Sequence, residues 1–222
     1  MSVYEHGFIL KKLPPGDSKF SVLTQSRGKL IIAIPPQTNM RLLNIGSRIQ
    51  FVVSDQQYNV HIVNNIQLVD SLHSPMLADL VWMHHLLELC YYFVPLHQLS
   101  HDCFEFLVQC NILLALQAHF QDMWESIKRI CIGILLCIVG FYPSDELLSP
   151  ILALKGALLR FIDFEDMQNI ELITETVQKV CIEQQKKFEQ WMLEYIETHP
   201  RREAFKTLNF MYNSLLLPFT EG

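Results

Sequence analysis

Two histidines and a glutamate lie close together near the middle of the chain. His84 and Glu88 are four residues apart, and His85 directly follows His84. On a helix, His84 and Glu88 would share one face, a spacing that can hold a metal ion. The motif is not the HExxH of zinc proteases, however, and no third ligand is evident. We therefore expect two ordinary helical histidines, one packed and one exposed, and no bound metal.

A cysteine beside a histidine is a second arrangement that could do chemistry, because a histidine can activate a thiol nucleophile. Cys90 lies near His84. Cys103 lies near His101. Neither cysteine follows the Gly-rich strand-to-helix turn that presents many nucleophiles, and the sequence has no Walker loop, GxGxxG or GxSxG motif. We expect a protein that is not an enzyme and that has no cofactor.

Basic residues in the first 72 positions are a third candidate group. Several of them flank predicted turns, where a small β-barrel presents side chains to a ligand, and Lys and Arg neutralise the phosphates of nucleic acids. The predicted DNA-binding residues are Lys11, Lys12, Lys19, Arg27, Lys29, Arg41 and Arg48.

Aromatic residues are interleaved with these basic ones. They could stack on nucleic-acid bases, or they could fill the core of a barrel, and the sequence leaves both readings open. The aromatic residues are Tyr4, Phe8, Phe20, Phe51 and Tyr58.

Five short β-rich runs, separated by turn residues, must position these side chains. Five strands in about 70 residues fit a small barrel, either an OB-fold, which commonly binds nucleic acids, or an SH3-like barrel. The predicted strands are Tyr4–Leu13, Phe20–Thr24, Lys29–Ile34, Ile49–Ser54 and Val60–Leu72, the last with a break at Asn64-Asn65.

The rest of the chain has apolar residues at helical spacing. The predicted helices are Met76–Phe93, Asp102–Phe120, Met123–Val139, Glu146–Phe161, Glu165–Glu197 and Arg201–Leu217, with the fourth broken by Pro150 and Gly156. We therefore predict an α+β, multidomain chain. Residues 1–72 would form a nucleic-acid-binding barrel, and residues 73–222 an all-α domain that binds proteins.

Charge changes sign at the same boundary. Residues 1–72 carry seven Lys/Arg against four Asp/Glu, a net of +3, whereas residues 73–222 carry ten against nineteen, a net of −9, which gives −6 overall. The six cysteines all lie in the helical part without CxxC spacing, which favours reduced thiols in a cytoplasmic protein. The longest strongly apolar run, Ile130–Phe141, is too short to cross a membrane, and no signal peptide is visible.

Short segments in both parts, taken in order, resemble a known family. They are Gly7–Leu10, Gly16–Thr24, Arg27–Leu30, Val139–Pro143, Leu193–Tyr195 and Arg202–Phe210. Together they are similar to the corresponding segments of RecO, the bacterial recombination mediator. The matching features include the Gly-Asp-Ser turn, the Arg-Gly-Lys turn and the Val-Gly-Phe-Tyr-Pro segment.

The resemblance implies an N-terminal OB-fold followed by a helical domain, and it implies a function without covalent chemistry. RecO binds single-stranded and duplex DNA, anneals complementary strands and docks on the acidic tail of single-stranded DNA-binding protein. With a RecR-like partner, it helps to load recombinase on the coated strand. A cytoplasmic, nucleoid-associated bacterial protein would follow.

Four basic residues of the helical part are predicted to meet protein partners. Arg129 lies where the family has a basic residue before its Leu-rich helix, so the resemblance implies that it pairs with an acidic tail. Arg201, Arg202 and Lys206 open the last predicted helix, where basic residues are mildly unfavourable. Their position indicates an acidic partner, either within the chain or outside it.

Two departures from the family pattern affect the expected function. Many members have a four-Cys zinc site after the Gly-Tyr-x-Pro segment, but residues 144–164 contain no cysteine, so we predict no zinc. The family's basic loop after the third strand corresponds here to Pro35–Arg41, which has one charge. Fewer phosphate contacts would weaken DNA binding. The sparse loop and the net charge of −6 favour an alternative, a non-catalytic protein-interaction adaptor whose barrel binds DNA weakly or not at all.

Overall fold

The β-rich runs in the first third of the chain form five strands. A computed structural model describes residues 4–15, 18–35, 43–72, 76–159, 175, 177 and 185–205. The strands are β1 (Tyr4–Leu13), β2 (Lys19–Thr24), β3 (Gly28–Ala33), β4 (Arg48–Gln57) and β5 (Val60–Asp70).

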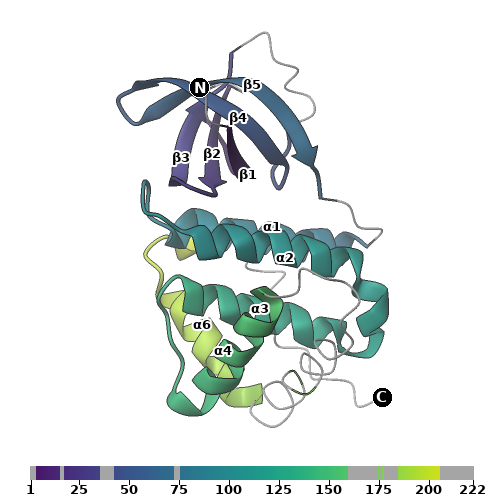
Figure 1. Ribbon diagram of the computed structural model, residues 1–222. Coiled ribbons are helices and arrows are strands. Elements are labelled where there is room, and N and C mark those ends of the chain that lie inside the picture. The colour runs from purple at the N-terminus through teal and green to yellow at the C-terminus, as the bar shows by residue number, and fades with distance from the viewer. Residues whose placement is uncertain are drawn as a thin grey trace. The chain divides into compact units, whose positions relative to one another are not determined.

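The five strands close into a barrel in the order β1-β2-β3-β5-β4 (Figure 1). Neighbouring strands are antiparallel except β3 and β5, which are parallel and pair Ile31 with Val60. The first strand closes the barrel on β4, where Phe8 lies opposite Arg48. The barrel is OB-fold-like, so the first of the two barrels left open by the sequence is confirmed.

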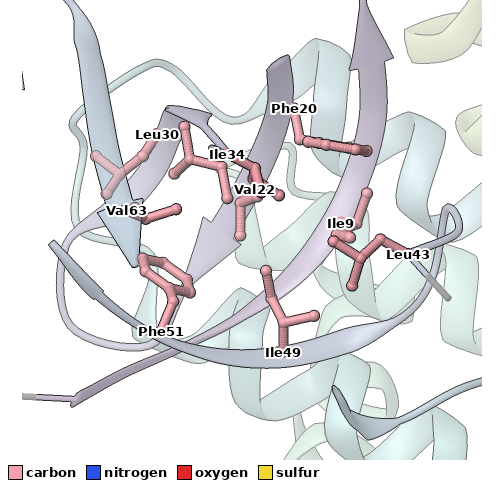
Figure 2. Packing of buried hydrophobic residues seen from close by; sticks show 10 residues of the cluster. Ile9, Phe20, Val22, Leu30, Ile34, Leu43, Ile49, Phe51 and Val63 are labelled. Carbon is pink, nitrogen blue, oxygen red and sulfur yellow. The ribbon is translucent and has the colours of Figure 1, made fainter. Parts of the chain in front are cut away.

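Inward-facing apolar side chains fill the barrel, and Figure 2 draws them as sticks between the strands. All ten members of the cluster are buried, and each fully buried side chain of this size contributes about 1.5–3 kcal/mol. The cluster consists of Ile9, Phe20, Val22, Leu30, Ile32, Ile34, Leu43, Ile49, Phe51 and Val63.

The predicted break at Asn64-Asn65 is wrong, because β5 continues through both residues. Its pairing with β4 shifts register between Val52 and Gln50, and Asn65 has φ +50°. Asparagine tolerates this left-handed conformation better than most residues. The asparagines therefore produce an irregularity within one strand instead of a turn between two.

Helices follow the barrel, which confirms the predicted α+β class with an all-α C-terminal part. The described helices are α1 (Leu77–Phe93), α2 (His101–Ala115), α3 (Trp124–Ile138), α4 (Asp145–Leu159) and α6 (Gln185–Thr198), with short 3₁₀ helices η2 (Gln117–Met123) and η4 (Arg202–Ala204). None of the helices in the described part of the chain is long and apolar enough to cross a membrane.

The chain divides into two compact units, Met1–Leu107 and Val108–Gly222. The barrel, α1 and the start of α2 belong to the first unit, so α1 shares a unit with the barrel although it lies beyond the predicted boundary at residue 72. The second unit contains α3, α4 and α6.

Proline and glycine residues have different effects on two of the helices. The helix α4 runs without interruption through Pro150 and Gly156, so the predicted break is wrong. Burial of Leu147 and Ile151 offsets the weak helix propensity of these residues. Gly140, by contrast, follows the end of α3 in the left-handed conformation typical of glycine there: it has φ +98°, and its N–H donates to Cys137 O at 3.1 Å.

A second glycine with positive φ lets two loops of the first unit approach closely. Gly28, between β2 and β3, has φ +72°, and a Cβ atom there would lie 1.8 Å from Gln98 O. Beside it, the N–H of His97 donates to Lys29 O at 2.9 Å, and Leu96 forms a bridge with Lys29. The loop after α1 therefore packs directly on the first residues of β3.

We expect Gly28→Ala to lower the free energy of unfolding much more than Gly140→Ala. Both positions carry the left-handed strain of about 1–2 kcal/mol, but a Cβ at Gly140 meets nothing within 4 Å. Only Gly28→Ala adds a backbone clash. Urea denaturation followed by circular dichroism measures the difference, and equal losses in the two variants would contradict the close approach at Gly28.

Candidate nucleic-acid interface

Lys29, a predicted DNA ligand, is buried against the end of α1. Its side chain is 7% exposed, and its Nζ donates to Tyr91 O at 2.6 Å. Tyr91 lies in the last turn of α1, where carbonyl groups lack helical partners and carry partial negative charge. Lys29 therefore satisfies the end of a helix within its own unit.

Lys11 turns toward the same place. Its Nζ lies 4.4 Å from the ring centroid of Tyr91 and 5.4 Å from that of Tyr92, and 3.5 Å from the Tyr92 hydroxyl oxygen. The two tyrosine rings meet edge to face at 4.9 Å. We call Lys11, Lys29, Tyr91 and Tyr92 the tyrosine joint, because they connect the barrel to α1.

Arg27 projects from a turn that a buried carboxylate holds in place. Glu5 accepts hydrogen bonds from the Ser26 N–H, at 2.8 Å, and from the Ser26 hydroxyl. Its other contact is Arg27 Nε, at 3.8 Å. Thr24 Oγ1 accepts from the Arg27 N–H at 3.1 Å and closes the turn. The Arg27 side chain stays 48% exposed, so its outer guanidinium nitrogens face solvent.

The remaining predicted DNA ligands are divided between the ends of the barrel. Lys12 is exposed and Lys19 half-buried, and both flank the β1–β2 connection. Arg27 follows the other end of β2, roughly 15–20 Å away at ~3.3 Å per strand residue. Arg48 is half-buried, and its Nε has no hydrogen-bond partner among the described residues. Arg41 lies outside the described residues.

The five aromatic candidates separate by exposure. Phe8, Phe20 and Phe51 are buried, two of them in the barrel cluster and Phe8 against Phe104 with ring centroids 5.4 Å apart. Tyr4 and Tyr58 are 47% and 97% exposed. Tyr58 occupies the β4–β5 turn with φ +56°. Only the tyrosines present faces on which a base could stack.

The predicted partner-binding residues have different surroundings. Arg129 is buried in α3, and its Nη1 donates to Glu189 Oε1 at 3.0 Å, so its first acidic partner is internal. Arg201 is exposed beside η4. The Arg202 side chain and Lys206 lie outside the described part.

The metal and thiol candidates have the surroundings of packed residues. His85 is 1% exposed and His84 is exposed, as the sequence predicts. Burial lowers the pKa of His85 to about 3, and partial desolvation of the ring lowers the pKa of the exposed His84, against the opposing charge of Glu88. Burial raises the pKa of the Cys90 thiol well above its usual value, so the thiolate nucleophile is disfavoured. The described residues include no cluster of three or more metal-binding side chains.

Sequence reasoning missed two arrangements. No pattern pairs Lys29 with Tyr91, because they lie on different elements of the first unit. Nor does any pattern bring His61 of β5 beside His97 of the α1–α2 loop, although their ring centroids are 5.8 Å apart. Only tertiary packing could reveal either.

The chain matches no protein-family model, and no characterised protein is similar enough to give a match. The resemblance to RecO therefore depends on the short segments of the sequence.

We expect Lys29→Met to destabilise the first unit by about 1–3 kcal/mol, because it removes a charged hydrogen bond and leaves the Tyr91 carbonyl unpaired. Lys12→Met, at an exposed position on β1, should change stability by no more than about 0.5 kcal/mol. Thermal or urea unfolding of the two variants measures this. A stable Lys29→Met protein would refute the structural role, and it would restore Lys29 as a candidate DNA ligand.

His85 should make the protein less stable in acid. Its pKa in the folded protein, about 3, lies below the unfolded value of 6.5, so between these pH values only the unfolded state binds the proton. The free energy of unfolding should therefore fall as pH decreases from 6.5, by at most about 1.4 kcal/mol per pH unit from this residue. His85→Gln should reduce that slope in urea titrations at several pH values. The neighbouring His84→Gln is the matched comparison: the pKa of His84 is lowered by less, so this variant should reduce the slope less, and equal slopes in both variants would exclude His85 as the main cause.

Proposed function

We propose that this chain is a non-enzymatic recombination mediator of the RecO type. It would bind single-stranded and duplex DNA, anneal complementary strands and help to load recombinase on DNA coated with single-stranded DNA-binding protein. The observation that carries the proposal is the OB-fold-like barrel followed by helices, in the order that the sequence resemblance implies. OB-folds commonly hold single strands through basic grooves and aromatic stacking.

The barrel's connecting loops are the best-supported DNA contacts. In OB-folds the β1–β2 and β4–β5 loops contribute to oligonucleotide binding. Here the first is flanked by Lys12 and Lys19, and the second presents Tyr58. Lys11 and Lys29 are assigned to the tyrosine joint, so they support the fold of the barrel instead of contacting phosphates.

The helical part would bind the protein partners, a RecR-like protein and the acidic tail of single-stranded DNA-binding protein. Exposed Arg201 is available to an acidic segment. Arg129 would have to exchange Glu189 for that segment, and a tail that offers several carboxylates could make the exchange. A nucleoid-associated, cytoplasmic location in a bacterium would follow from this function.

A second candidate function is a protein-interaction adaptor with little DNA binding. The observation that favours it is that several basic side chains of the barrel have internal partners: Lys11 and Lys29 contact α1, and Arg27 contacts Glu5. The two functions differ in whether the full chain binds a single strand in a salt-dependent way.

Fluorescence anisotropy with a labelled oligothymidylate, at several salt concentrations, tests the first function. We expect salt-dependent binding by the unchanged chain. Replacing both Lys12 and Lys19 with Gln should flatten the salt slope by about 1.4, at ~0.7 per phosphate contact. Tyr58→Ala should weaken binding by about 1–3 kcal/mol with the slope unchanged, because it removes stacking alone.

Lys187→Gln is the matched control, since Lys187 is an exposed lysine of α6 that pairs with Glu146. It removes one positive charge far along the sequence from the barrel, and it should leave binding nearly unchanged. Salt-insensitive or absent binding by the unchanged chain would refute the mediator and favour the adaptor.

A further inference from the structure

His61 is a buried histidine whose two ring nitrogens have no hydrogen-bond partner among the described residues. It lies near the start of β5, opposite Ile32 in the parallel pairing, and its side chain is on the same side of the strand as Val63 of the core. Only 5% of the residue is exposed. Buried polar groups in proteins are nearly always hydrogen-bonded, so an unpaired imidazole calls for an explanation, and a bound ligand is one.

His97 lies against this imidazole from the loop between α1 and α2. The two ring planes are tilted by 60°. His97 has φ +60°, an unusual conformation for a residue other than glycine, and its N–H is held by Lys29 O. Strained residues that their surroundings hold in place are frequent at binding sites. His97 is itself exposed, so its ring can contact a ligand.

Arg27 lies two residues before Lys29, whose carbonyl accepts from the His97 N–H, and it adds a permanent positive charge beside that loop. Its only described side-chain partner is Glu5, at Nε, and that carboxylate already accepts two hydrogen bonds from Ser26. Burial lowers the pKa of His61, and the nearby His97 and Arg27 lower it further. Both groups that act electrostatically on His61 are therefore basic.

This charge distribution selects the class of ligand. A metal ion would need a third ligand, and the described residues contain no group of three metal-binding side chains. The Arg27 guanidinium would also repel a cation. An oxyanion such as phosphate fits better. It is attracted by the Arg27 guanidinium, and guanidinium and imidazole N–H groups donate hydrogen bonds to phosphate oxygens.

We propose that Arg27, His61 and His97 form a binding site for a phosphate group at this end of the barrel. The outer guanidinium nitrogens of Arg27 and the ring of His97 make the first contacts. Each ring nitrogen of His61 exposes less than 1 Å². The His97 side chain therefore turns aside on binding, and one His61 N–H then donates to a phosphate oxygen.

Two kinds of ligand offer such a phosphate group: the backbone of a nucleic acid, and a small molecule such as a free nucleotide. The site shares no residue with the proposed DNA contacts at Lys12, Lys19 and Tyr58. It would therefore be present whether or not those residues bind a strand.

Histidine ring resonances of the full-length chain test the site by NMR, with inorganic pyrophosphate and oligothymidylate as separate probes at matched ionic strength. We expect saturable shifts of the His61 and His97 signals with pyrophosphate, and no shift of His84, an exposed histidine of α1. Shifts with both probes identify a backbone phosphate as a possible source. Shifts with pyrophosphate alone identify a small-molecule phosphate.

Two variants test the contacts without disturbing the barrel core. Arg27→Gln and His97→Asn should each weaken pyrophosphate binding about tenfold, the loss expected for one charge-assisted hydrogen bond. Asparagine is chosen because it tolerates the positive φ of His97. His84→Gln is the control and should bind as the unchanged chain does. His61→Phe keeps a ring of similar bulk and should abolish binding, and if it fails to fold the other two variants decide.

The site is refuted if neither probe moves the His61 and His97 signals more than that of His84. Unchanged pyrophosphate affinity in both Arg27→Gln and His97→Asn would equally refute it. Neither result bears on anisotropy measurements with Lys12, Lys19 and Tyr58 variants, so failure of this site and failure of DNA binding remain distinguishable.

Discussion

The hydrogen bond between the buried ammonium of Lys29 and the carbonyl of Tyr91 fixes the first unit of this protein. A charge removed from water needs a strong partner, and the end of a helix supplies one because its last carbonyls are unpaired. Once the bond forms, the backbone of Lys29 also receives the N–H of His97. One residue of β3 thus holds the end of α1 and the loop that follows it. The close approach at Gly28 is a consequence, since a side chain there would push the loop away.

The same interaction decides which basic residues remain for a ligand. With Lys11 and Lys29 in the tyrosine joint, the positive charge that stays accessible lies near the ends of the barrel, at Lys12 and Arg27. An OB-fold-like barrel can use its loops for this purpose, because a flexible strand can follow scattered phosphates. This barrel presents less accessible positive charge to a polyanion than a barrel whose lysines were all exposed would. The modest net charge of +3 for residues 1–72 therefore overstates what a polyanion would meet.

The strands and most helices could be predicted because hydrophobic periodicity is a local signal. In β2 and β3, the residues of the barrel cluster recur at every second position, at Phe20 and Val22 and at Leu30 and Ile32. The errors occurred where packing overrides a local preference. Pro150 reads as a helix breaker, yet burial of Leu147 and Ile151 keeps α4 continuous. Asn64-Asn65 reads as a turn, yet pairing with β4 carries the strand through it.

Local patterns were enough to predict the class of this fold, a five-strand barrel followed by helices. They were also enough to predict that His84 and His85 would differ in exposure, because adjacent helical residues face different directions. Tertiary packing decided which basic side chains are internal, which aromatics are exposed, and that His61 lies against His97. The physical reason is that periodicity assigns a side chain to one face of its own element. The partner on that face comes from a distant part of the chain, and only the closed barrel and its packed helix bring the two together.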